Sequence, residues 1–599
     1  MYVFPVADDT KPARGVGAVR EAAGRDRAGR PGRDRREAEG VAGGVDRPHL
    51  AMSLEATARR AAYAALAVVP VAVVAVFFVL PVGAMLHRGL WPEGRFAPGA
   101  VLDVLARPRT GRVLWFTLWT STLATTLAVA LGLPAAYVLH RLRFPGRALV
   151  RAALLVPFVL PTVVVGLAVR ESIAPSGILG FLDLDGTPAA IIVGLVFFNV
   201  AVVIRTVGVA WESLDRRPGE AAAALGATPW QVFRTVTLPA LRPAIVSAAS
   251  VVFLFCATAF GVVLVLGGVK YSSVETEIYL LTADLLDLPA AAALSLVQML
   301  AVVVLLVVVG RLRAVPDPTV RRASATPARP HLRDLPALVV TAATLVAVAL
   351  PVLALVVGSL RRDGHWSLDY YRALGGSADG LFEVSLTHAL LASLRIAVDA
   401  TWMSLLLGLA VAFLVTRRVR SRTGRRARAV LDGFFMLPLG VSAVTLGFGF
   451  LIALDSPPLD LRASPLLVPV AQALVALPIV VRTLVPVLAG IDDRQRQAAA
   501  SLGAGPLRTL LTVDLAVVWR PLLAAAGFAF AVSLGEFGAT TFIVRPAEPT
   551  LPVVIYRLLG HPGPLNHGSA LAASVVLAAV TAAVILVVER LRVPGTGAW

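Results

Sequence analysis

Cysteine and lysine are almost absent from this chain, which has one cysteine, Cys256, and two lysines, Lys11 and Lys270, among 599 residues. A single cysteine excludes a disulfide within the chain and a structural metal site built on paired thiols. A P-loop requires a lysine directly after a glycine of its phosphate-binding loop, and neither lysine follows a glycine. If the protein is driven by ATP, another polypeptide must hydrolyse it.

Acidic residues are fewer than basic ones, 37 against 55, and the formal net charge is +18. A nucleic-acid-binding role would need a basic soluble domain, and no polar stretch is long enough to form one. The arginines are instead expected in the cytoplasmic loops of a membrane protein. Residues 1–51 are rich in Gly, Arg and Glu and lack the apolar core of a signal peptide. We predict that they form a disordered basic tail, or that the true start is Met52.

Apolar residues are abundant, at 57% of the chain, and they are gathered in long blocks. A block of about 20 apolar residues is long enough to cross a bilayer as a helix. The sequence therefore predicts an all-α, polytopic membrane protein with about 12 transmembrane helices. The predicted helices are 61–86, 113–139, 152–169, 187–204, 243–269, 289–310, 336–360, 389–416, 429–454, 464–490, 521–544 and 567–588.

The two halves of the chain are related by an internal repeat. Aligning Glu220 with Gln497 gives an offset of 497 − 220 = 277 residues, and proline, arginine and glycine positions elsewhere share this register. Pro161 thus aligns with Pro438, and the pair Phe260-Gly261 aligns with Phe537-Gly538. We predict a tandem duplication of six-helix domains, at 52–313 and 336–599, joined by a cytoplasmic linker at 314–335.

The distribution of arginine predicts the orientation in the membrane. The loops at 140–151, 311–334 and 417–428 are rich in arginine, which places them and both chain termini in the cytoplasm. The loop at 87–112 is an exception, because it carries five arginines on the predicted outer side. We expect a multi-pass protein of the bacterial cytoplasmic membrane.

A short polar segment at 220–243, "EAAAALGATPWQVFRTVTLPALRP", separates two apolar blocks and returns in altered form at 497–521. Gly226 is placed to end a helix in the left-handed conformation. Thr228, Pro229 and Gln231 form a capping box that starts another helix. The pattern predicts a rigid helical hairpin with Trp230, Val232 and Phe233 at its tip, ended by Pro239 and Pro243. An ordinary loop on the membrane surface is the alternative.

The spacing of Glu220, Gly226 and Pro239 resembles the EAA signature of type I permease subunits of binding-protein-dependent ABC importers. The resemblance implies that the hairpin docks into a cytoplasmic ATPase dimer, which binds ATP-Mg, and that this chain has no catalytic, metal or cofactor site. The second copy departs from the signature at Gln497 and Ala516. The ATPase-coupling residues carried over are Glu220, Ala221, Ala222, Gly226, Trp230, Leu238, Pro239, Gln497, Ala498, Ala499 and Gly503.

The two-in-one arrangement is similar to the fused permeases for thiamine and for iron(III). The strings "VLVLGG" (263–268), "ETEIY" (275–279), "SLGEFGA" (533–539) and "LPVVIY" (551–556) favour the thiamine branch. The resemblance implies import of a small solute, thiamine or alternatively iron(III), from an extracytoplasmic binding protein. A twelve-helix secondary transporter is the alternative from another class, and a channel is a weaker one.

Some polar and glycine residues within the apolar blocks need an explanation. Glu536 is expected either to line the substrate pathway or to accept structural hydrogen bonds beside Gly535 and Gly538. Arg395 and Asp399 lie one helical turn apart and are expected to pair. Gly447 and Gly449 are expected to mark close helix packing.

Overall fold

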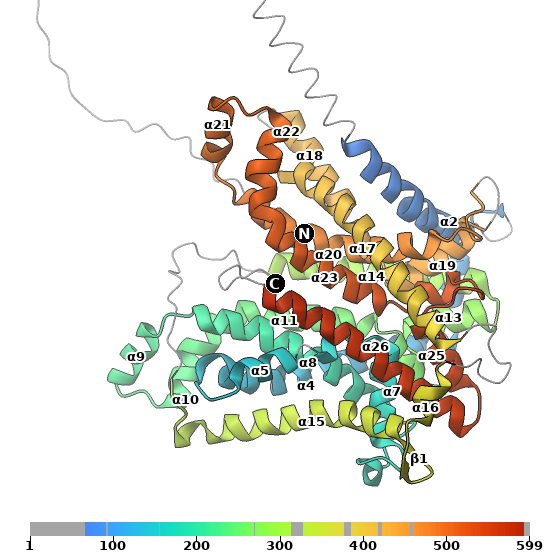
Figure 1. Cartoon of the computed structure of the whole chain (residues 1–599), viewed down its shortest axis with the longest axis horizontal. Helices are drawn as coiled ribbons and strands as arrows, with labels where there is room; N and C mark the ends of the chain where they lie inside the picture. Colours follow the sequence, from blue (N-terminus) through green and yellow to red (C-terminus); the bar gives the residue numbers. More distant parts are fainter. Residues whose placement is uncertain are drawn as a thin grey trace, which may run out of the picture. The chain divides into compact units, whose positions relative to one another are not determined.

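The computed structural model describes residues 66–591 apart from 92–93, 155, 269, 313–327, 376–384, 417–421 and 456–458. The predicted tail at 1–51 and most of the predicted linker lie outside this part of the chain. Within it, nearly all secondary structure is helical (Figure 1). The strands described are one short hairpin of β1 (Arg361–Arg362) and β2 (His365–Trp366). The predicted all-α fold is confirmed.

Ten helices among the described residues are long and apolar enough to cross a bilayer, and each overlaps a predicted block. The predicted helices 243–269 and 521–544 are wrong at their ends, because the spans there stop at Ala257 and Leu534 and the chain breaks before α12 (Gly261–Gly267) and α24 (Thr540–Ile543). Five belong to the first half: Leu66–Leu90, which includes η1 (Ala75–Val79) and α2 (Leu80–Leu90), α4 (Pro108–Arg141), α8 (Pro188–Ser213), Pro229–Ala257, and α14 (Leu288–Leu312). Five belong to the second half: Leu332–Leu360, which includes η5 (Leu332–Asp334) and α15 (Leu335–Leu360), α17 (Leu386–Thr416), α20 (Leu467–Ala489), Leu510–Leu534, and α26 (Pro564–Leu591).

The remaining two predicted spans, 152–169 and 429–454, are broken helices. The first is divided into α5 (Arg147–Ala153), α6 (Val156–Val159) and α7 (Thr162–Ile173), and the chain bends by 106° between α6 and α7. The second is divided into α18 (Arg422–Met436), η6 (Leu437–Gly440) and α19 (Ala443–Ala453). Pro161 and Pro438, which are equivalent in the repeat, lie at the two breaks, because proline restricts the residue before it and lacks a backbone donor. The prediction of continuous helices at these two places is wrong.

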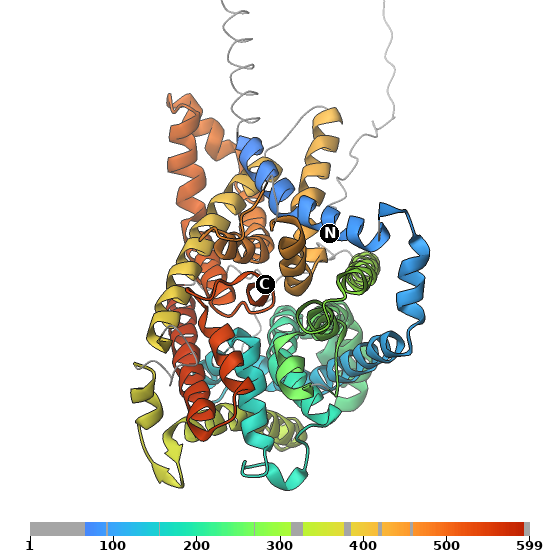
Figure 2. The same cartoon turned by 90° about the vertical axis from the view of Figure 1, so that its right-hand side faces the viewer.

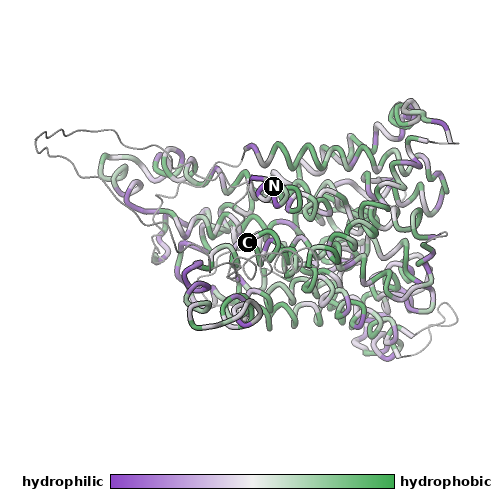
Figure 3. The backbone as a smooth tube through the Cα atoms, turned by 90° about the horizontal axis from the view of Figure 1, so that it is seen from above, coloured by the Kyte–Doolittle hydropathy of each residue, from purple (hydrophilic) through white to green (hydrophobic). Residues whose placement is uncertain are grey.

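Two of the spans consist of several elements. Pro229–Ala257 comprises α10 (Pro229–Val232), η4 (Phe233–Thr237) and α11 (Leu238–Ala257), and Leu510–Leu534 comprises η7 (Leu510–Asp514) and α23 (Leu515–Leu534). Shorter elements connect the spans: α3 (Pro98–Ala106), η3 (Gly180–Leu182), α9 (Arg217–Ala224), α12 (Gly261–Gly267), α13 (Val274–Ala283), α16 (Asp369–Ala373), α21 (Asp493–Ser501), α22 (Pro506–Thr509), α24 (Thr540–Ile543) and α25 (Leu551–Gly560). Apolar residues dominate the long helices in Figure 3. The long helices therefore present the surface expected of bilayer-spanning segments.

The first span of each half crosses over to the other half. Helix α2 packs against α14 of its own half and α19 of the second, and α15 packs against α26 of its own half and against α4 and α7 of the first. Figures 1 and 2 show the first span, in blue, beside helices of the second half in orange. A Cβ atom at Gly449 would lie 3.1 Å from Pro81 Cβ, and one at Gly447 would lie 2.7 Å from Ala539 Cα. The predicted close packing at both glycines is confirmed.

The largest buried apolar cluster draws on both halves. It includes Phe260 and Ile278 from the first half and Phe537 and Ile555 from the second. Since close side-chain packing is a main source of association between membrane helices, this shared cluster holds the two halves together.

Candidate functional site: paired hairpins and an aromatic cluster

The first polar segment forms the predicted helical hairpin. Helix α9 ends at Gly226, which adopts φ +90°. The amide of Gly226 donates to Ala223 O (3.0 Å) and that of Ala227 donates to Ala222 O (3.1 Å), so the helix ends in a Schellman motif. Helix α10 then starts with a complete capping box between Thr228 and Gln231. The turn geometry predicted from the sequence is confirmed.

The second polar segment repeats this turn at the equivalent positions. Gly503 has φ +81°, and its amide donates to Ala500 O at 3.0 Å. The amide of Ala504 donates to Ala499 O, also at 3.0 Å. The backbone of the two turns is therefore the same although Gln497 replaces the glutamate and other side chains differ.

The residues predicted to couple to an ATPase lie on matching surfaces of the two hairpins. Glu220 and Gln497 are exposed, as are Ala221 and Ala498, whereas Ala222 and Ala499 are half-buried. Both glycines of the turns are exposed. Figure 1 places α9 and α10 towards the same side as α21 and α22. The structure thus presents two similar projections on one side of the protein.

Large apolar side chains are exposed on both projections, including two that the sequence reading missed. Leu225 is 90% exposed and Leu502, its equivalent, is 88% exposed, which makes both more accessible than Trp230 at 68%. Their position directly before each turn glycine could have identified them in the sequence. Val232 and Phe233, expected at the tip, are half-buried. Paired exposed leucines offer two equivalent apolar contacts to a partner.

Pro239 does not end the hairpin, contrary to the prediction. Residues Pro229–Ala257 form one continuous span, in which η4 leads directly into α11. Leu238 and Pro239 begin α11 directly after the π-helical turn η4, and Pro243 lies inside the helix. In the second half α23 begins at the equivalent residue, Leu515, with Ala516 in place of the proline. The hairpin is therefore rigidly joined to the following span in both halves.

The base of each hairpin is held in a different way. In the first, the Phe233 ring stacks against Trp230 (centroids 5.5 Å apart) and Trp211 (6.3 Å). In the second, Arg496 Nε donates to Asp514 Oδ1 at 2.8 Å, and Asp514 is fully buried. The positions equivalent to Arg496 and Asp514 are Gly219 and Thr237. An aromatic stack supports one hairpin and a buried ion pair supports the other.

Glu536 accepts structural hydrogen bonds, as one of its two expected roles requires, while its place in the substrate pathway stays a prediction. It is 7% exposed and accepts hydrogen bonds from the amides of Ala539 (2.7 Å) and Thr540 (3.0 Å), and from the Thr540 hydroxyl. These contacts hold the turn that starts α24. Arg395 pairs with Glu548 at 3.6 Å, while Asp399 accepts from Trp402 Nε1 at 3.2 Å. The predicted pairing of Arg395 with Asp399 is therefore wrong.

Equivalent aromatic residues of the two halves meet inside the protein. The Phe260 and Phe537 rings stack with centroids 5.3 Å apart and an interplanar angle of 15°. Tyr279 packs on Phe260 at 5.4 Å, and Tyr556, its equivalent at the same offset, packs on Phe537 at 5.5 Å. We call these four residues the aromatic tetrad. The repeat of Phe-Gly was visible in the sequence, but the tyrosines were not singled out.

Two arginines of the discordant loop at 87–112, Arg107 and Arg109, have acidic partners far along the chain. Arg109 donates to both carboxylate oxygens of the buried Glu277, at 2.6 and 3.1 Å. Arg107 donates to Asp287 at 2.9 Å. Burial opposes ionisation of Asp287, but hydrogen bonds from Arg107 and the Ala290 amide lower its pKa overall. These ion pairs give Arg107 and Arg109 a structural role in fixing this loop to α13 and to the turn before α14.

A second buried carboxylate joins the halves. Glu275, at the start of α13, is fully buried and accepts from Ser442 Oγ, just before α19, at 2.9 Å. The Gln298 amide of α14 donates to the same carboxylate. In the sequence, Glu275 is distinguished only as the first residue of the string at 275–279. Its hydrogen bond across the two halves fixes α13 against the second half.

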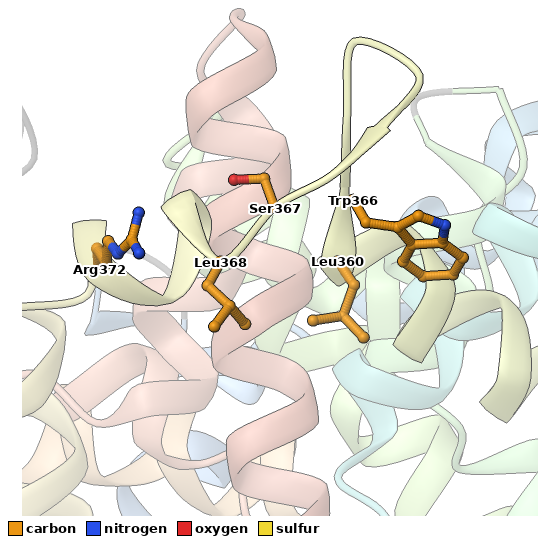
Figure 4. A pocket seen from close by; sticks show the side chains of 5 residues that line it. All are labelled: Leu360, Trp366, Ser367, Leu368 and Arg372. Atoms are coloured by element: carbon orange, nitrogen blue, oxygen red, sulfur yellow. The ribbon is translucent and has the colours of Figure 1, made fainter.

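Two hollows lie on loops at the opposite ends of the spans from the hairpins. One is lined by Leu360, Trp366, Ser367, Leu368 and Arg372 beside the β1–β2 hairpin. Figure 4 shows Leu360 and Leu368 together at its floor, with Trp366 to one side. The other lies between the halves, where His567 Nε2 is 3.1 Å from Glu171 Oε2. Loops from both halves therefore surround the end away from the hairpins.

Comparison with known proteins identifies the family. The model described as "Binding-protein-dependent transport system inner membrane component" matches residues 128–322. The chain is 30% identical over 553 residues to the "Thiamine transport system permease protein ThiP" of Brucella abortus (strain 2308), covering 89% of this chain and 97% of that protein. The protein of the same description from Escherichia coli (strain K12) is 28% identical over 461 residues, with 75% and 83% covered.

A relative from another transport system matches a smaller part of the chain. The "Sulfate transport system permease protein CysT" of Escherichia coli (strain K12) is 32% identical over 220 residues, which is 35% of this chain and 79% of that protein. Such proteins are transport permeases rather than enzymes. The chain belongs to the binding-protein-dependent transport system inner membrane components, as a fused ABC importer permease that resembles the thiamine permeases over most of its length.

Proposed function

We propose that this chain is the translocating subunit of an ATP-driven importer that carries thiamine into the cytoplasm. An extracytoplasmic binding protein would deliver the vitamin, and a separate ATPase dimer, loaded with ATP-Mg, would drive the change of conformation. The observation that carries the proposal is the pair of equivalent hairpins with matching turns and matching exposed leucines. A two-fold ATPase needs two such sites on one side of its partner.

The hairpins define the orientation under this proposal. If they bind a cytoplasmic ATPase, both termini and the arginine-rich loops near 140–151 and 417–428 also lie in the cytoplasm. The loops that carry Trp366 and Glu171 then face the binding protein. The rigid connection of η4 to α11, and of η7 to α23, would transmit movement of the ATPase subunits directly to membrane spans.

The choice of thiamine rests on the relatives named for that vitamin, which the chain matches over most of its length. Iron(III) is the alternative cargo for the same architecture. A secondary transporter would move its solute without an ATPase. These alternatives differ in the label taken up and in the requirement for ATP.

The test is uptake by proteoliposomes that contain the chain with its cognate ATPase and binding protein. We expect ATP-dependent uptake of labelled thiamine and none of labelled ferric iron. Gly226→Pro should abolish uptake, because proline cannot adopt φ +90°. Gly186→Pro is the matched control, since Gly186 has φ +66° in the loop between η3 and α8, at the other end of α8 from the hairpin.

Each alternative has a distinct result. Uptake of ferric iron would replace the cargo and keep the ATPase-driven mechanism. Uptake of thiamine without ATP, unchanged by Gly226→Pro, would exclude the importer and favour the secondary transporter. Equal loss of uptake in both glycine variants would show that the effect of Gly226→Pro comes from misfolding, and the coupling role would then be unsupported.

A further inference from the structure

The aromatic tetrad lies where the two halves of the repeat meet. Phe260 and Phe537 are equivalent residues, and so are Tyr279 and Tyr556, yet the two phenylalanines touch each other. Equivalent points of two related halves can touch only on or near the axis that relates them. A path shared equally by both halves must run along the same axis. The tetrad therefore stands on the axis that any central path would follow.

The backbone around each phenylalanine is broken rather than helical. Phe260 lies between α11 and α12, and Phe537 lies between α23 and α24. A Cβ atom at Gly261 would approach the Val163 amide to 3.0 Å, and one at Gly538 would approach the Val444 amide to 3.3 Å. Each break is thus pressed against the start of α7 or α19, the helices that follow the proline breaks. Movement of these broken helices would reach the tetrad directly.

Polar side chains hydrogen-bond to the backbone at the two breaks beside Phe260 and Phe537. The Ser273 hydroxyl donates to Ala259 O at 3.1 Å, and Glu536 binds the start of α24. Glu536 therefore acts as a positioning residue for Phe537. Phe260 is 6% exposed and Phe537 is 1% exposed, so both stacked rings are buried in this structure.

We propose that the aromatic tetrad seals the central path and that its ring faces contact the solute when the halves separate. Separation of the stack exposes the faces of Phe260 and Phe537, flanked by the two tyrosine rings. Aromatic faces attract flat cations, both by stacking and by cation–π interaction. This inference rests on the proposed function, because thiamine combines a positively charged thiazolium ring with an aromatic pyrimidine ring.

The contact is tested by replacing both phenylalanines with leucine, which keeps an apolar seal and removes the aromatic faces. In Phe260→Leu/Phe537→Leu we expect thiamine uptake at subsaturating concentration to fall about 5- to 30-fold, the size of a desolvated cation–π contact. Stimulation of ATP hydrolysis by the binding protein should remain within about twofold of wild type. The substitutions change contacts with the solute and leave the hairpins unaltered. Phe158→Leu/Phe198→Leu is the matched control, since these rings lie 5.5 Å apart within the first half.

The seal is tested without any solute. In a Cys256→Ser background, a cysteine is introduced by Phe537→Cys or, as a second position, Tyr556→Cys. We expect a membrane-impermeant cationic thiol reagent to label each slowly at rest and several-fold faster after trapping with ATP and vanadate, because separation of the halves exposes these positions. Equal labelling in both states at both positions would overturn the seal.

The outcomes separate this inference from the proposed function. Wild-type thiamine uptake by the leucine variant would overturn the ring contact and leave thiamine import intact. Absence of thiamine uptake by the wild type would overturn the proposed function and the thiamine contact together. The labelling result would still decide whether the tetrad seals the path.

Discussion

The two hairpins have the same backbone but different supports. Gly226 and Gly503 end their first helices with equivalent hydrogen bonds, whereas Phe233 with Trp211 supports one base and Arg496 with Asp514 supports the other. The turn is therefore the same in both hairpins while the packing beneath it differs. The comparison shows that different side-chain contacts can hold the same projection.

The largest expected effect comes from breaking the ion pair of the second hairpin. Arg496→Ala removes the guanidinium from the fully buried Asp514 carboxylate, which should lower the free energy of unfolding by about 3 kcal/mol. Arg496→Gly/Asp514→Thr copies the first hairpin and should cost less, because no charge remains buried. Thermal unfolding in detergent measures both, with the exposed Arg494→Ala as control. Equal destabilisation by the single and double variants would contradict the assigned role of the pair.

The aromatic base of the first hairpin is expected to give a smaller effect. Phe233→Leu copies the second hairpin, which has Leu510 at the equivalent position. Loss of the stacking against Trp211 and Trp230 should cost about 1 kcal/mol. The same unfolding measurement applies, and Phe181→Leu serves as control because Phe181 is 80% exposed. A loss no larger than that of the control would show that the stack does not support the hairpin.

The turn glycines should have equal and modest effects on stability. Gly226→Ala and Gly503→Ala each place a Cβ in the left-handed region, at about 1 kcal/mol, and no atom lies within 4 Å to add a clash. Gly186→Ala has the same backbone cost on another loop. We expect all three to lower stability alike, and only the first two to reduce ATP-dependent uptake. Reduced uptake in all three would remove the link between the turns and coupling.

Exchange of the charge at the first residue of the two signatures, Glu220 and Gln497, should have the smallest effect. Glu220→Gln makes the first like the second, and Gln497→Glu does the reverse. Both side chains are exposed, so stability should change by less than about 0.5 kcal/mol. A charged contact with the ATPase would make the salt dependence of stimulated ATP hydrolysis weaker in Glu220→Gln and stronger in Gln497→Glu. Identical salt dependence in wild type and both variants would exclude such a contact.

Local signals in the sequence were sufficient for the turns and for most spans. Glycine at a helix end and the Thr228–Gln231 box act over a few residues, so their geometry follows from the sequence alone. Hydropathy also located ten long helices. It failed at Pro161 and Pro438, because an apolar window counts side chains and does not register a change in backbone direction.

Contacts between distant segments were not predictable in the same way. The pairs Arg109–Glu277 and Glu275–Ser442 join residues more than 160 positions apart, and one sequence gives no sign of which helices pack together. The expected pair Arg395–Asp399 shows the converse error, since spacing along a helix permits a contact that tertiary partners replace. Tyr279 and Tyr556 were within reach, because the offset that aligned Phe260 with Phe537 also aligns them.

The exchange of first spans makes the two halves a mechanical interlock. Helix α2 lies against α19 and α15 lies against α7, so the first span of each half is packed against the other half. A tilt of either half would therefore be expected to move the first span of the other half with it, which couples the two movements. A chain cut within 313–327 would keep this interlock, so its fragments should assemble as two polypeptides that still move as one.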